Sequence, residues 1–154
     1  MSVPEGKRSK GKLSIETEAF KFLDYIFNIT TKYYLPPEIN EGIDERLVLQ
    51  EYEQAKWFAE KMRNLAVDCL SQVQEANRLI VDETLDLLYE RKKHQDNAER
   101  SLENLLAVAT VMYRKKKIKS KRFKNIGVEV GVLKRKIQNW QKSDKRRFES
   151  KNKE

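Results

Sequence analysis

The chain has 154 residues, enough for a single domain with a sizeable core. Its 32 lysines and arginines outnumber 24 aspartates and glutamates, which gives a formal net charge of +8. Only five glycines and three prolines occur, and this favours long helices over many short strands. Cys69 is the only cysteine and His94 the only histidine, so an internal disulfide and a Cys/His metal site are excluded. No apolar run approaches the ~18 residues of a membrane span, so we expect a cytoplasmic protein without a membrane partner.

The first predicted helix follows a basic N-terminal segment. Residues 1–12 carry four basic residues, one acidic residue and two glycines, which indicates a flexible basic arm. From Ile15 onward, apolar side chains recur at every third or fourth position, as on one face of an amphipathic helix. Ser14 is its expected N-cap. The helix is expected to stop before Pro36 and Pro37, because neither can donate to the helical hydrogen-bond ladder.

The second and third predicted helices are separated only by a weak boundary. The second helix follows the connection at residues 36–44 and is expected to span about 35 residues. Because it is longer than its neighbours, we expect irregular structure between Ile43 and Tyr52. The third helix is expected to begin after Asp82 as N-cap, and its apolar stripe ends at Met112.

A polar interruption and a fourth helix complete the pattern. Lys92 and Gln95 break the third stripe, which predicts a solvated or polar-paired layer. The fourth helix has Ser120 as its expected N-cap and an apolar stripe of Phe123, Ile126, Val130, Leu133, Ile137 and Trp140. Four amphipathic helices with short connections predict an all-α fold, an antiparallel up-down four-helix bundle. The bundle should cover residues 13–148, and a charged tail should cover residues 149–154.

Positive charge is concentrated in the last quarter of the chain. Residues 113–154 carry 17 basic and four acidic residues, and the stretch 113–125 carries eight basic and no acidic residue. Such segregation is typical of nucleic-acid binders, although an exposed charge run is more often merely solvated. The preference for lysine over arginine favours sequence-independent contacts with phosphates. We expect an exposed basic ridge that binds nucleic acid, made of Arg114, Lys115, Lys116, Lys117, Lys119, Lys121, Arg122, Lys124, Arg135, Lys142, Arg146 and Arg147.

Catalytic patterns are missing from the sequence, so we do not expect an enzyme, a metal site or a cofactor. Cys69 lies in an apolar stripe and should be a buried, inert thiol. Gly127 and Gly131 form a G-x-x-x-G pattern within the fourth helix. Each glycine destabilises a helix by roughly 1 kcal/mol relative to alanine, so a reason for both is expected. Close approach of a helix, either within the bundle or from a neighbouring subunit, would supply it.

Both ends of the chain resemble a known group of proteins. The opening MSVPEGKRSKGKL, the helix end AVDCLSQVQEANRLIV at residues 66–81 and the two C-terminal helices at residues 90–148 carry the likeness. In the last segment the matching positions are Gln95, Leu105–Ala107, Ser120–Arg122, Glu129–Val130, Trp140 and Ser143–Asp144. The group is similar to Avd, the accessory variability determinant of diversity-generating retroelements. Its wider superfamily includes proteins encoded in 23S rRNA intervening sequences. Residues 30–60 depart from the pattern.

The resemblance implies a homopentamer of four-helix bundles that binds a reverse transcriptase and its template RNA or cDNA, without catalysis of its own. Two alternatives stay open. One is a bundle that associates with ribosomal RNA and has no polymerase partner. The other is a structural homo-oligomer whose basic residues only keep it in solution.

Overall fold

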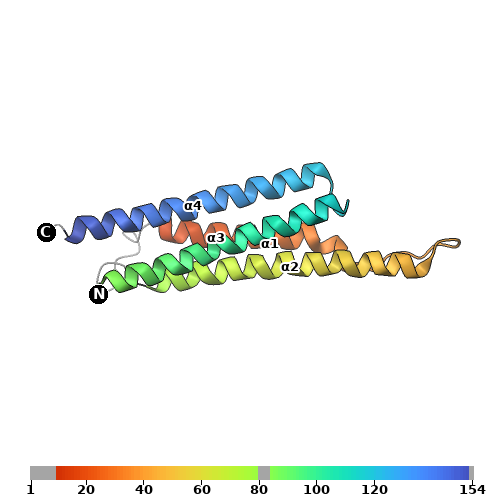
Figure 1. Ribbon diagram of the computed structural model, residues 1–154, viewed down its shortest axis with the longest axis horizontal. Helices are drawn as coiled ribbons and strands as arrows, with labels where there is room; N and C mark the ends of the chain where they lie inside the picture. The colour runs from red at the N-terminus through yellow and green to blue at the C-terminus, as the bar shows by residue number, and fades with distance from the viewer. Residues whose placement is uncertain (1–9, 80–83, 153–154) are drawn as a thin grey trace.

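The protein is an antiparallel four-helix bundle, as the sequence predicts (Figure 1). The computed structural model describes residues 10–79 and 84–152, and no strand occurs in this part of the chain. The helices are α1 (Lys10–Thr30), α2 (Glu45–Arg78), α3 (Leu85–Arg114) and α4 (Ser120–Asn152), with a short 3-10 helix, η2 (Thr31–Tyr34), after α1. Contacts link α1 to α2, α2 to α3, α3 to α4 and α4 back to α1, so the four helices enclose one core.

Several helix boundaries differ from the sequence-based prediction. Helix α1 begins at Lys10, so Ser14 is not its N-cap and residues 10–12 of the predicted arm are helical, while residues 1–9 lie outside the described part. Helix α4 continues to Asn152 and includes most of the predicted tail. Asp82, the predicted cap of α3, is also outside the described residues. Thr84 caps α3 instead, since its hydroxyl accepts a hydrogen bond from the Leu87 N–H at 3.2 Å.

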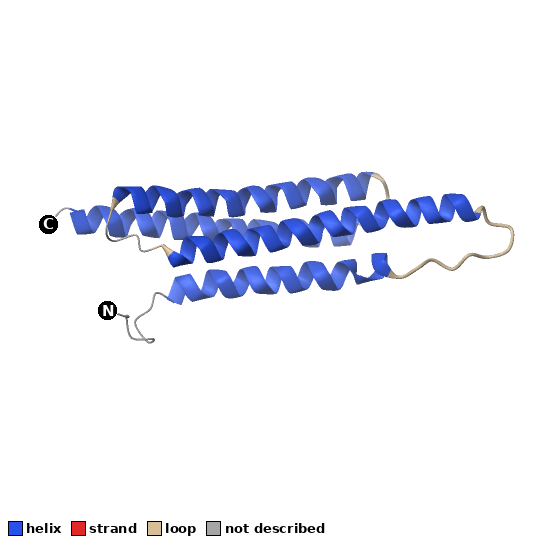
Figure 2. Ribbon diagram, turned by 90° about the horizontal axis from the view of Figure 1, so that it is seen from below, coloured by secondary structure: helices blue, strands red, loops and turns tan. Residues whose placement is uncertain are grey.

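The predicted irregular start of the second helix is wrong. Helix α2 is continuous from Glu45, and its N-cap Asp44 accepts a hydrogen bond from the Arg46 N–H at 3.0 Å. Gly42 in the preceding connection has φ +86°, a conformation that glycine adopts without steric cost. With 34 residues, α2 is much longer than the 21-residue α1. Its first turns therefore extend beyond the end of the bundle where α3 turns into α4 (Figures 1 and 2).

The core follows the predicted apolar stripes over most of each helix. Its fully buried side chains include Ile26 of α1, Val73 of α2, Leu102 of α3 and Ile137 of α4. Cys69 is buried as predicted, and burial raises the pKa of its thiol to about 12, so it is a poor nucleophile at neutral pH.

The predicted stripes fail at the helix ends. Leu47 and Tyr89 are 59% and 60% exposed, and Leu85 is also exposed, although all three continue an apolar periodicity. Leu47 lies in the first turn of α2, while Leu85 and Tyr89 lie in the first two turns of α3. An apolar stripe therefore indicates which face of a helix can be buried, but it does not show that a neighbouring helix covers that face.

A buried ion pair joins α3 to α4 near the end where the chain termini lie. The Arg91 guanidinium donates two hydrogen bonds to the Asp144 carboxylate, at 2.8 and 2.9 Å, and a third to the Leu79 carbonyl at 3.0 Å. The Gln95 side-chain amide donates to the same carboxylate at 2.8 Å. The Arg91 guanidinium carbon also lies 4.9 Å from the centroid of the Trp140 ring.

The predicted polar layer exists at Gln95, which donates to the buried Asp144 carboxylate. It does not include Lys92, whose side chain is exposed and pairs with Asp96.

We predict that Asp144→Ala lowers the free energy of unfolding by about 3–5 kcal/mol, because it removes the buried carboxylate that accepts two hydrogen bonds from the Arg91 guanidinium. Urea denaturation followed by circular dichroism measures this loss. The matched control is Glu103→Ala, which removes a carboxylate from the exposed α3–α4 pair with Lys134. That variant should lose less than about 1 kcal/mol. Equal losses in the two variants would contradict the importance of the buried pair.

Candidate nucleic-acid interface

The turn between α3 and α4 is built from a helix C-terminus of well-defined geometry. The Lys117 N–H donates to the Met112 carbonyl at 2.8 Å, and the Lys116 N–H donates to the Tyr113 carbonyl at 3.0 Å. This is the Schellman arrangement, whose penultimate residue takes the left-handed conformation and is usually glycine. Here that residue is Lys116, with φ +59°, the one non-glycine residue of positive φ in the described part of the chain. Ile118 is buried beneath the turn and anchors it to the core.

Most of the predicted cations are exposed, as expected. Lys117 is the exception, because its side chain is only 10% exposed and its ammonium lies 3.4 Å from the Glu51 carboxylate. Arg147 is exposed but donates to Asp144 at 3.1 Å. The remaining ten make no ion pair with a carboxylate of residues 10–79 or 84–152, and they are Arg114, Lys115, Lys116, Lys119, Lys121, Arg122, Lys124, Arg135, Lys142 and Arg146.

These cations form two groups, so the predicted continuous ridge is wrong in its middle. The first group, residues 114–124, surrounds the α3–α4 turn and is called the basic turn below. The second occupies α4 from Arg135 onward. Between them α4 exposes Val128, which is 61% accessible, together with Glu129 and Val132. At 1.5 Å per residue the gap is about 16 Å long.

The two glycines of α4 do not serve contact within the bundle. A Cβ atom built on Gly127 or Gly131 would meet no atom within 4 Å, so no helix of the same chain approaches either position closely. The prediction of close intra-bundle packing at these residues is therefore wrong. Contact with a neighbouring subunit stays a prediction, and the exposed Val128 and Val132 lie on the same stretch of helix.

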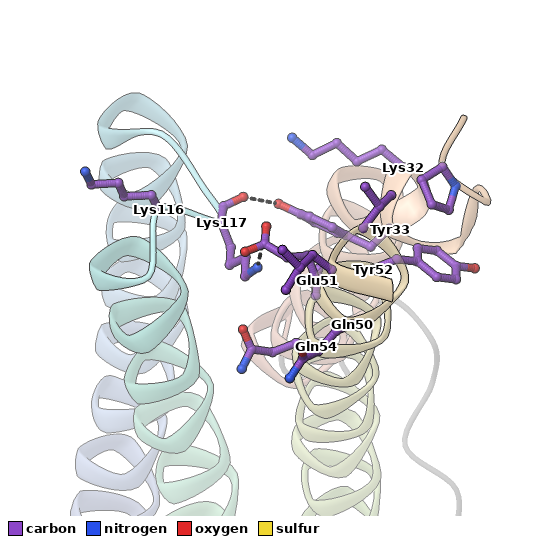
Figure 3. A pocket seen from close by; sticks show the side chains of 12 residues that line it. Lys32, Tyr33, Gln50, Glu51, Tyr52, Gln54, Lys116 and Lys117 are labelled. Atoms are coloured by element: carbon purple, nitrogen blue, oxygen red, sulfur yellow. Dashed lines mark hydrogen bonds and ion pairs between the residues drawn. The ribbon is translucent and has the colours of Figure 1, made fainter. Parts of the chain in front are cut away.

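A cleft of about 750 Å³ opens beside the basic turn, and no pattern in the sequence predicts it (Figure 3). We call it the tip cleft. One wall is the start of α2, another is η2, and the third is the α3–α4 turn. It is lined by Lys32, Tyr33, Pro37, Leu47, Val48, Gln50, Glu51, Tyr52, Gln54, Ala55, Lys116 and Lys117. No motif unites these residues, because only the fold brings the three segments together.

Two contacts cross the tip cleft and fix its width. The Tyr33 hydroxyl donates to the Lys117 carbonyl at 2.9 Å, and the Lys117 ammonium pairs with Glu51 (Figure 3). Burial raises the pKa of Tyr33, while the positive charge of Arg122 acts in the opposite direction.

Helix η2 is held in place by a stacked arginine. The Arg63 guanidinium carbon lies 4.3 Å from the Phe27 ring centroid and 4.1 Å from that of Tyr34. Its Nε also donates to the Thr30 hydroxyl at 2.8 Å. Cation–π contacts of this kind stabilise a local arrangement by roughly 0.5–2 kcal/mol. The wall of the tip cleft that carries Lys32 is therefore ordered by contacts outside the cleft.

Side chains that commonly bind metals do not cluster within residues 10–79 and 84–152. No group of three or more His, Cys, Asp or Glu side chains among them could hold a metal ion. His94 is half-buried, and its ring Nδ1 lies 2.7 Å from the side-chain Oε1 of Gln72. Of the helices described, none combines the length and apolarity that crossing a membrane requires.

Comparison with protein-family models, with curated proteins and with solved structures finds no match to this chain.

Proposed function

We propose that the protein is a non-catalytic accessory subunit that oligomerises and binds nucleic acid through the basic turn and the C-terminal half of α4. The observation that carries this proposal is the set of ten exposed cations without a carboxylate partner among the described residues. Concentrated like charges repel one another and destabilise the compact state, so a bound polyanion would relieve a repulsion that the carboxylates of the described residues do not offset.

The conformation of Lys116 supports the same proposal. A left-handed backbone costs a non-glycine residue roughly 1–2 kcal/mol, and glycine would remove that strain. Strained residues tend to occur at functional sites, where the side chain has a use. At this position the side chain adds an ammonium group to the basic turn.

The partner enzyme is inferred from the resemblance to the Avd group. The likeness covers α3 and α4, which carry the basic turn, and in that group the bundle assists a reverse transcriptase during mutagenic retrohoming. We therefore propose a retroelement reverse transcriptase as protein partner, template RNA or cDNA as ligand, and a homopentamer as the assembly.

The first prediction concerns the salt dependence of nucleic-acid binding. Each phosphate contact contributes about −0.7 to −0.9 to the slope of log K against log salt. Lys121→Gln/Arg122→Gln should therefore weaken binding and reduce the slope by about 1.4–1.8, measured by fluorescence anisotropy over a salt series. The matched control, Lys93→Gln/Arg100→Gln, removes the same charges from exposed positions of α3. Equal slopes in the two variants, or binding that salt does not affect, would contradict the proposed interface.

The second prediction separates stability from binding at one residue. Lys116→Gly should raise the free energy of unfolding by about 0.5–1 kcal/mol, because relief of the left-handed strain exceeds the added entropy of glycine. The same variant should bind nucleic acid more weakly. Lys115→Gly is the control, since it removes the same charge at a residue of φ −86° and should not stabilise the protein. A Lys116→Gly protein that is less stable would contradict the assignment of strain.

The third prediction concerns assembly. Light scattering should give a mass several times that of the 18.3 kDa chain. Gly127→Leu/Gly131→Leu should reduce the mass to one copy without loss of helicity, because a Cβ atom at either position meets no atom of the same chain within 4 Å, whereas the two leucines would block a neighbouring subunit. Asn125→Leu/Glu129→Leu places leucines with the same spacing at exposed positions and should leave the assembly intact. A wild-type protein of one copy would overturn the proposed oligomer.

A further inference from the structure

The tip cleft combines three kinds of group that suit one class of ligand. Leu47, Val48 and Ala55 of α2 form an apolar wall, and Pro37 extends it. Apolar walls with a few placed polar groups are the usual composition of small-ligand sites, and about 750 Å³ lies within their range of sizes. The contacts of Tyr33 and Glu51 with Lys117 fix the positions of the walls relative to one another. The cleft is therefore formed without a ligand.

Three polar side chains of the cleft, Gln50, Gln54 and Lys32, are available for binding. Gln50 and Gln54 lie one helical turn apart on the wall formed by α2, and neither side chain makes a hydrogen bond with another described residue (Figure 3). A carboxamide offers two donors and an acceptor, which is the pattern needed to pair with the edge of a nucleobase. Lys32 extends from η2 above the Tyr33 ring, 5.1 Å from its centroid, and has no carboxylate partner in the described part.

The net positive charge of the side chains that line the cleft favours an anionic ligand. Lys32, Lys116 and Lys117 line it against one carboxylate, Glu51, and that carboxylate is already paired with Lys117. The cleft also opens beside the basic turn, because Lys116 and Lys117 belong to both. A strand whose phosphates lie on the basic turn can therefore reach the cleft with its next nucleotide.

From these features we infer that the tip cleft binds one unpaired nucleotide of a strand held by the basic turn, with its base against the apolar wall and its phosphate at Lys32. The inference rests on the proposed function and adds that the ligand is single-stranded nucleic acid. In a duplex the faces of each base are stacked and its pairing edge is occupied, whereas an unpaired base offers both to the protein.

The test compares two leucines of α2. Leu47→Glu places a carboxylate in the cleft, while Leu49→Glu makes the same change two residues away, at an exposed leucine that does not line it. The probes are internally labelled single strands of about 12 nucleotides, RNA and DNA, and a blunt duplex of the same total phosphate count. Wild-type protein should prefer the single strand by about fivefold or more, which is the lower end of the stacking effect. The RNA and DNA arms decide which sugar the cleft accepts.

The outcomes separate the inference from the proposed function. Leu47→Glu should abolish the preference for the single strand and Leu49→Glu should keep it. Loss of the preference in both variants, in neither, or its absence in the wild type would overturn the cleft proposal while nucleic-acid binding stands. If neither probe binds the wild type at low salt, the proposed function itself is wrong.

A second pair of variants keeps the test valid if Leu47→Glu does not fold, as judged by circular dichroism. Lys32→Gln removes the expected phosphate contact from an exposed side chain, and Lys93→Gln removes the same charge from α3. Lys32→Gln should weaken single-strand binding more than duplex binding, and Lys93→Gln should affect both equally. Equal effects of the two substitutions on the single strand would overturn the proposal.

Discussion

The buried pair of Arg91 and Asp144 is the constraint on which the position of α4 depends. A charge removed from water costs several kcal/mol unless its partners are in place, and here the carboxylate also accepts from Gln95. A shift of α4 by one turn along α3 would break the two hydrogen bonds between Arg91 and Asp144 and the one from Gln95, so we infer that the pair sets the register of the two helices. With that register fixed, the α3–α4 turn and its cations are held about 30 Å away, at the far end of α3.

The distribution of carboxylates explains why the basic turn remains uncompensated. Glu18 pairs with Lys21 and Lys136, and Glu103 pairs with Lys134, so acidic side chains of the bundle neutralise cations along its sides. At the tip, Glu51 is the carboxylate of the described residues that pairs with the basic turn. Because no other carboxylate of residues 10–79 and 84–152 pairs with the basic turn, we infer that solvent ions or a bound polyanion supply the remaining counter-charge. Release of those ions on binding provides the driving force.

Periodicity predicted the fold well because most of each helix is covered by the other three. It failed at Leu47 and Tyr89, since a 3.6-residue repeat identifies an apolar face but not the presence of a neighbour. The buried Arg91 was missed for a different reason, because charged residues are almost always exposed and nothing local marks this one. The cations of the candidate interface could be predicted from composition. The tip cleft could not, because it joins segments around residues 32, 50 and 117.

The tip cleft follows from unequal helix lengths. Pro36 and Pro37 prevent α1 and η2 from continuing, whereas α2 has an N-cap at Asp44 and runs for 34 residues. The first turns of α2 thus have no helix beside them on the side of α1, and they face the α3–α4 turn across the tip cleft (Figure 3). The exposed Leu47 of this overhang lines the same cleft as Lys32 and Lys116, so apolar surface and positive charge meet at one opening, which is the combination that a nucleotide requires.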